Sequence, residues 1–136
     1  MSPQAWGAFH DGTLTAVEGR VPGTVALGVE IGYLRAMFEP AGTGFVLTLT
    51  GCTALRYLPW DEAPVDDPAA IAARKPGISG LGSIDPVVVD CVGGRLELAY
   101  AGLSIALENG AEVDEAGLRR GFDAYWDRWA AARSGG

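Results

Sequence analysis

The most regular stretch of the chain alternates apolar residues with small or polar ones from position 25 to position 33. The apolar members of this alternation are Val25, Leu27, Val29, Ile31 and Tyr33. Side chains two residues apart on a strand point to the same face, so the period predicts a strand with one buried face. The Pro22-Gly23 pair just before it predicts a tight turn that joins it to an earlier strand at residues 13–21.

Five further stretches predict strands because they are rich in β-branched, aromatic and leucine residues. They are residues 45–50, 53–58, 86–91, 95–100 and 103–107. Gly51 predicts a bulge between the first two, since glycine in a strand pattern often marks one. Gly93-Gly94 and Ala101-Gly102 predict the turns of a three-strand meander. The glycine-rich residues 78–83 predict a loop or a sheet edge.

A short helix is predicted at residues 69–75. Asp67 is placed as its N-cap, and Pro68 takes the first helical position, where a missing N–H costs nothing. Ile71 is its only sizeable apolar side chain. We therefore expect this helix to lie on the surface.

A longer helix is predicted after Asp114, which is placed as its N-cap, with Val113 and Leu118 as a hydrophobic staple. Large apolar side chains recur on one face of this helix at Leu118, Phe122, Tyr125, Trp126 and Trp129. Burying such side chains stabilises a protein by about 2–3 kcal/mol each. We expect the stripe to bury against the sheet.

These elements predict an α+β fold: an antiparallel, curved meander sheet of about seven strands, packed by one long C-terminal helix. A chain of 136 residues is long enough to bury one full core. We find no internal repeat and no linker, so residues 1–136 are expected to form a single domain.

The net charge of −7 limits the kinds of partner that the protein could bind more than its apolar content does. An acidic domain is repelled by phosphate backbones, so no nucleic-acid partner is expected, whereas a basic protein partner fits. The chain has no run of about 20 apolar residues, so no membrane partner is expected. Its first residues show no secretory signal pattern, which favours a cytoplasmic location.

The sequence lacks the residue sets of common cofactor and metal sites. Cys52, Cys91 and one histidine do not make a zinc site, and both cysteines fit small core positions. There is no phosphate-binding loop, no dinucleotide fingerprint and no HExxH or CxxC motif. We expect no cofactor, no bound metal and no catalytic residue set.

His10, the single histidine, precedes Asp11 and Gly12. Histidine is a good general base near neutral pH, so a hydrolase or isomerase that uses His10 is one hypothesis. Neighbouring residues on a strand point to opposite faces, which argues against a joint catalytic role. The favoured interpretation is structural, with Asp11 in an Asx-turn and Gly12 supplying the permissive φ.

Two sets of side chains are candidates for binding. The first is a binding surface that combines a tryptophan with acidic residues, made of His10, Asp11, Trp60, Asp61, Glu62, Asp66 and Asp67. The second is a cavity between the sheet and the C-terminal helix, lined by Tyr33, Tyr100, Trp126 and Trp129. The outward-facing Glu30, Arg56, Asp90 and Glu97 are expected to form cross-strand charge pairs or, alternatively, to line a cavity.

Phe9-His10-Asp11-Gly12, the Pro-Gly turn, the strand at 25–33 and the stretch from Phe45 to Leu55 together resemble a loose group of small bacterial proteins. These share an N-terminal FHD(G/A) motif, and the late meander strands also fit, so the resemblance spans residues 9–108. Most members have no assigned function, and some are assigned as immunity proteins of toxin systems. The resemblance implies no catalytic residues, and the C-terminal aromatic helix departs from the pattern.

The sequence thus favours a non-enzymatic domain that acts by binding, in its most concrete form an immunity-type or protein-interaction protein. The alternatives are a small-molecule-binding domain and an enzyme that uses His10. An open meander edge also favours a homodimer, because unpaired strand edges invite pairing.

Overall fold

The computed structural model describes residues 1–134. Its strands are β1 (Thr13–Gly19), β2 (Gly23–Glu30), β3 (Gly44–Cys52), β4 (Ala54–Pro59), β5 (Ile78–Ile84), β6 (Val87–Cys91), β7 (Gly94–Ala99), β8 (Gly102–Leu107) and β9 (Glu112–Val113). Its helices are the 3-10 helix η1 (Pro3–Phe9) and the α-helices α1 (Gly32–Arg35), α2 (Pro68–Arg74) and α3 (Glu115–Ser134). The predicted α+β class is confirmed.

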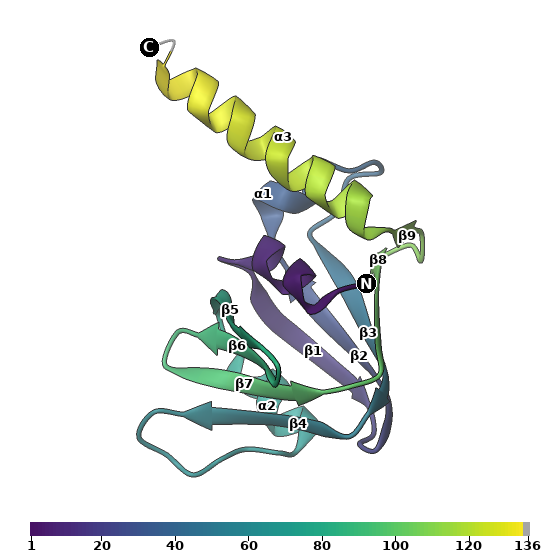
Figure 1. Cartoon of the computed structure of the whole chain (residues 1–136), viewed down its shortest axis with the longest axis vertical. Coiled ribbons are helices and arrows are strands. Elements are labelled where there is room, and N and C mark those ends of the chain that lie inside the picture. The colour runs from purple at the N-terminus through teal and green to yellow at the C-terminus, as the bar shows by residue number, and fades with distance from the viewer. Residues whose placement is uncertain (135–136) are drawn as a thin grey trace.

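The strands form two antiparallel sheets, where the sequence predicted one curved meander of about seven strands. One sheet has the order β1-β2-β3-β8-β9 and the other the order β4-β7-β6-β5 (Figure 1). The predicted meander is present as β6, β7 and β8, but β8 lies in the other sheet. The glycine-rich stretch predicted as a loop or an edge is the edge strand β5.

The two sheets share one long, bent strand pair. Strand β3 passes into β4 with only Thr53 between them, and β7 passes into β8 through Tyr100-Ala101. Gly51 lies at this corner with φ +58°, and a Cβ on it would lie 2.9 Å from Cβ of Ala101. Glycine is required here because other residues rarely adopt this φ, and the space is already filled. A second junction joins the starts of β1 and β5, where the N–H of Ile78 donates to the carbonyl of Gly12 (2.7 Å).

The core lies between the sheets and is closed by η1, which the sequence analysis did not predict. Trp6 and Phe9 of η1 are buried, and the ring of Phe9 meets that of Phe45 edge-to-face at 5.4 Å. Helix α2 begins as predicted, with Oδ2 of Asp67 accepting a hydrogen bond from the N–H of Ala70 (2.9 Å). Ile71 is fully buried and anchors this helix to the core.

Two expectations for the local structure are wrong. Strand β2 ends at Glu30, and Tyr33 lies in the one-turn helix α1, because the chain leaves the sheet at Ile31. Helix α3 packs on η1 and α1 and not on a sheet face, and its C-terminal half projects away from both sheets (Figure 1). The aromatic stripe is therefore buried only at its start: Leu118 is buried, whereas Trp129 is 45% exposed.

Candidate functional site

His10 lies between α1 and α3, where its two ring nitrogens have different neighbours. The Tyr33 hydroxyl donates to the carbonyl oxygen of His10 (2.8 Å) and lies 3.2 Å from its Nδ1. A hydroxyl has one proton, so we assign the second contact as Nδ1–H donating to the Tyr33 oxygen. Nε2 lies 3.6 Å from Oδ2 of Asp11. These contacts fix the ring and favour the structural interpretation of His10.

Aromatic rings from α1 and α3 surround this histidine. The His10 ring stacks on Trp126 with a centroid distance of 5.6 Å and an interplanar angle of 21°. Tyr33 packs against Tyr125 at 4.6 Å, and Trp126 meets Trp129 edge-to-face at 5.6 Å. Burial, and then the nearby charge of Asp11, raise the pKa of Tyr33 to about 12. The cluster holds the middle of α3 onto α1 and the end of η1.

The predicted cavity set is only partly brought together. Tyr33, Trp126 and Trp129 belong to the aromatic cluster, where the rings pack on one another. Tyr100 lies at the β7–β8 corner, where its hydroxyl accepts a hydrogen bond from Nε1 of Trp6 (3.2 Å). The sequence analysis missed this partner because η1 carries no periodic pattern.

Asp11 supplies the positive φ that the sequence analysis gave to Gly12. Its φ is +70°, and its N–H donates to the carbonyl of Ile78 (2.7 Å). Gly12 is needed for space, since a Cβ on it would lie 2.9 Å from the carbonyl oxygen of Phe9. Aspartate tolerates the left-handed region better than most residues, so the motif is explained by turn geometry.

The remaining members of the predicted binding surface lie between β4 and α2. Trp60 is 61% exposed, and Asp61, Asp66 and Asp67 are exposed beside it. Asp67 caps α2, and Glu62 pairs with Arg74 (2.8 Å), which lowers the pKa of that carboxyl. His10 and Asp11 are held by α1, α3 and the start of β5 instead. The predicted surface is therefore built by two separate groups of elements.

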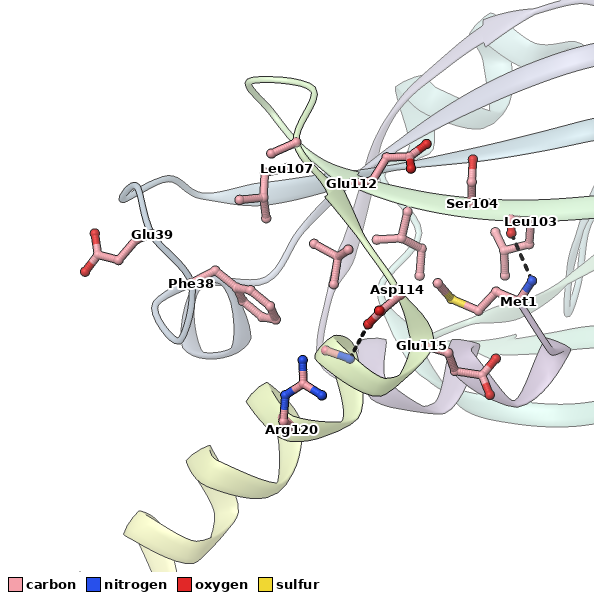
Figure 2. A pocket seen from close by; sticks show the side chains of 14 residues that line it. Met1, Phe38, Glu39, Leu103, Ser104, Leu107, Glu112, Asp114, Glu115 and Arg120 are labelled. Carbon is pink, nitrogen blue, oxygen red and sulfur yellow. Dashed lines mark hydrogen bonds between the residues drawn. The ribbon is translucent and has the colours of Figure 1, made fainter.

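An open groove of about 730 Å³ lies between β8–β9 and the start of α3. Apolar side chains from distant parts of the chain form its floor: Phe38, Leu103, Ile105, Leu107 and Val113. Figure 2 shows Leu103, Ser104 and Leu107 spaced along β8, with Phe38 at one end of the groove and Met1 at the other. Leu103, Ile105, Leu107 and Val113 are buried below it.

The rim of this groove is acidic. It carries Glu39, Glu112, Asp114 and Glu115 against two cations, Arg120 and the ammonium group of Met1, which donates to the carbonyl of Leu103 (3.3 Å) (Figure 2). Asp114 is the predicted N-cap of α3, and its Oδ1 accepts from the N–H of Gly117 (2.6 Å). The Ser2 N–H donates to Glu115 (2.5 Å), which lowers the pKa of that carboxyl. Glu39 and Glu112 are exposed, so their carboxylates are open to solvent at the edge of the groove.

A smaller groove, of about 240 Å³, lies between η1 and α3. Its walls include Ala5 and Ala8 of η1 and Leu118 and Phe122 of α3. His10 lines neither this groove nor the larger one. A general base has to reach a bound substrate, so neither groove supports the enzyme hypothesis.

The sequence analysis also missed an ion pair between the buried Arg35 and the exposed Glu108. Arg35 of α1 is 1% exposed, and its Nε donates to Oε1 of Glu108 (2.6 Å) and to the carbonyl of Gly44 (3.1 Å). Glu108 also accepts from the backbone N–H of Thr43 (2.7 Å). This bond, and then Arg35, lower the pKa of Glu108 to about 2. The pair ties the loop that contains Phe38 to Glu108, which directly follows β8.

The other candidate site residues make contacts that are typical of structural residues. Arg56 pairs across the strands with Glu97 (3.9 Å), in the predicted manner. Cys52 and Cys91 are buried free thiols in different sheets. Within residues 1–134, no three metal-ligating side chains form a group that could hold an ion. None of the helices described is long and apolar enough to cross a membrane.

No family model matches the chain, and no curated protein or solved structure matches it either.

Proposed function

We propose that the chain is a protein-binding domain, and that a basic, partly apolar segment of its partner lies in the groove between β8–β9 and α3. The observation that carries the proposal is the apolar floor of this groove inside an acidic rim. Apolar side chains of the segment would cover Phe38 and Leu103, while its lysines or arginines would meet Glu39 and Glu112.

The charge of the whole protein supports the same kind of partner. A net charge of −7 attracts a basic protein and raises the rate at which the two meet. The resemblance of residues 9–108 to the FHD(G/A) group makes the proposal more specific: an immunity-type protein that blocks a basic toxin domain. Two free thiols fit a reducing compartment, so we place this binding in the cytoplasm.

A small-molecule site is the second candidate function. The volume of the groove, about 730 Å³, is within the range of pockets that hold small ligands. The groove is open along its length and carries four carboxylates. An extended peptide segment fits such a shape better, because it can contact the floor and both rims at once.

The test selects peptides from a displayed random library on the purified full chain. Enriched peptides should combine arginine or lysine with leucine or an aromatic residue. Binding of the best peptide is then measured by fluorescence anisotropy on two double variants. Glu39→Lys with Glu112→Lys should weaken it by at least about tenfold, as expected when two charged contacts become repulsive.

The matched control is Asp61→Lys with Asp66→Lys. It changes the net charge by the same amount, but in residues 60–67, which we call the Trp60 segment. It should leave binding within about twofold of the wild type. If this control loses binding and the groove variant does not, the binding surface is the Trp60 segment. Equal losses would mean that net charge alone matters. Either result, or enriched peptides without basic residues, overturns the groove proposal.

A further inference from the structure

The loop between β8 and β9, residues 108–111, contains the single asparagine of the chain. This residue, Asn109, is followed by Gly110, and both are exposed to solvent. Gly110 has a φ of +90°, and outside its two chain neighbours no atom lies within 4 Å of the place where its Cβ would be. Its backbone nitrogen is therefore shielded neither by a side chain of its own nor by another segment.

The side chain of Asn109 is folded over the peptide bond that follows it. Its Oδ1 accepts a hydrogen bond from the N–H of Ala111 (2.9 Å), which makes an Asx-turn. The ring that this hydrogen bond closes contains the side-chain carbon Cγ of Asn109 and the backbone nitrogen of Gly110. A donor on Oδ1 also makes Cγ a better electrophile, because it stabilises the negative charge that develops on the oxygen during attack.

We propose that Asn109 is a site of spontaneous deamidation in the folded protein. The backbone nitrogen of Gly110 loses its proton to hydroxide and attacks Cγ of Asn109. A new N–C bond closes a succinimide ring, the bond from Cγ to the side-chain nitrogen breaks, and ammonia leaves. Water then opens the ring at either carbonyl and leaves aspartate or isoaspartate at position 109. Water is consumed and ammonia released, and nothing is oxidised or reduced.

The folded loop slows this reaction only slightly. The N–H of Gly110 donates to the carbonyl of Leu107 (3.0 Å), and this bond has to open before the nitrogen can attack. Opening a single exposed hydrogen bond lowers the reactive fraction by at most about tenfold. Because Asn109 is exposed, water and hydroxide reach it without any larger unfolding.

The products would alter one border of the groove. Either product adds a carboxylate directly after Glu108, and isoaspartate also lengthens the main chain by a methylene group. The register pairs Glu112 and Val113 of β9 with β8, so a longer loop should loosen a strand that has few pairs to hold it. Both residues line the groove. The reaction does not require the groove to bind anything, so this inference and the proposed function can fail independently.

The first test follows the full chain in mildly alkaline buffer by peptide mapping with mass spectrometry. The peptide that contains Asn109 should gain the mass of an amide converted to an acid and separate into two products. A protein-isoaspartate methyltransferase with a labelled methyl donor identifies the isoaspartate. Gln4 is the internal control, since it is the other side-chain amide of the chain and is also exposed. Asn109→Gln is the matched variant and should stay unmodified at 109, because its longer side chain does not close this ring.

The second test compares the native chain with the chain unfolded in urea, and circular dichroism checks that aged samples and the variant are folded. The native rate should lie within about tenfold of the unfolded rate. Hydrogen exchange at residues 112–113 should be faster in the aged protein, and unchanged exchange would overturn the effect on β9. A native chain that stays unmodified while the unfolded chain reacts would overturn the inference. Equal isoaspartate in the wild type and in Asn109→Gln, or modification confined to Gln4, would do the same.

Discussion

The hydroxyl of Tyr33 donates a hydrogen bond to the carbonyl oxygen of His10 (2.8 Å) and lies 3.2 Å from the Nδ1 atom of the same residue. This pair ties α1 to the end of η1, at the place where α3 packs on both. It also bears on whether His10 has a catalytic or a structural role. Its ring is held by a tyrosine and stacked on Trp126, which are the contacts of a structural residue.

The raised pKa of Tyr33 predicts how the protein responds to alkali. Burial raises this pKa from 10.0 to about 12, so the folded state keeps the proton more tightly than the unfolded state does. The resulting stabilisation is complete below pH 10 and is lost as the pH rises toward 12. The free energy of unfolding, from urea titrations, should fall less steeply over this window in Tyr33→Phe than in the wild type. Equal slopes would contradict the assignment.

Substitutions at Asp11 should separate turn geometry from chemistry. The φ of +70° costs most residues about 1 kcal/mol, and glycine adopts it freely. Asp11→Gly should therefore stay within about 0.5 kcal/mol of wild-type stability, whereas Asp11→Ala should lose about 1 kcal/mol. Urea denaturation measures both. Equal losses in the two variants would show that the carboxylate stabilises the fold and that the backbone conformation does not explain the motif.

Local signals predicted the local structure well. Asp67 and Asp114 cap α2 and α3 as expected, because a cap depends on residues within one turn. The period of two predicted β2 correctly up to Glu30 and then continued to Tyr33 by coincidence. An apolar residue that starts a one-turn helix looks the same in sequence as the next inward position of a strand. Helix η1 was missed for a related reason, since a short 3-10 helix has no amphipathic period to read.

Long-range arrangement could not be predicted in the same way. The division into two sheets depends on a bend at Gly51 in a strand that continues to β4, and the alternation on either side does not show it. The groove joins Phe38, strand β8 and Arg120, which lie far apart in the chain and meet through the topology. The aromatic stripe of α3 predicted burial against the sheet, whereas the helix packs on η1 and α1 and leaves Trp129 45% exposed.

The two cysteines should be unreactive in the folded protein. Both are buried, and burial raises the pKa of the Cys91 thiol to about 11, so almost no thiolate forms near neutral pH. A chromogenic disulfide reagent should label neither thiol in the native protein and both after unfolding in urea. Fast labelling of one thiol in the native state would mean that its strand opens locally. A missing thiol after unfolding would indicate a disulfide.

The ion pair between Arg35 and Glu108 should control stability in acid. The pKa of Glu108 is lowered from 4.5 to about 2, mainly by the N–H of Thr43 and by Arg35, so the folded state favours the charged carboxylate. The stabilisation is complete above pH 4.5 and is lost as the pH falls toward 2. Glu108→Gln removes the charge that compensates the buried guanidinium, so it should cost on the order of 1–3 kcal/mol at neutral pH. Its stability should also depend less on pH in this window.

The control for that variant is Glu112→Gln, which removes one exposed carboxylate from the neighbouring strand β9 and so changes the net charge equally. Thermal unfolding followed by circular dichroism between pH 2 and pH 7 compares the three proteins. The wild type and the control should lose stability together in acid, while Glu108→Gln starts lower and changes less. If Glu108→Gln matched the control throughout, Arg35 would be compensated by its backbone carbonyl partners alone, at Gly44 and Phe38. The loop that positions Phe38 at the groove would then not depend on Glu108.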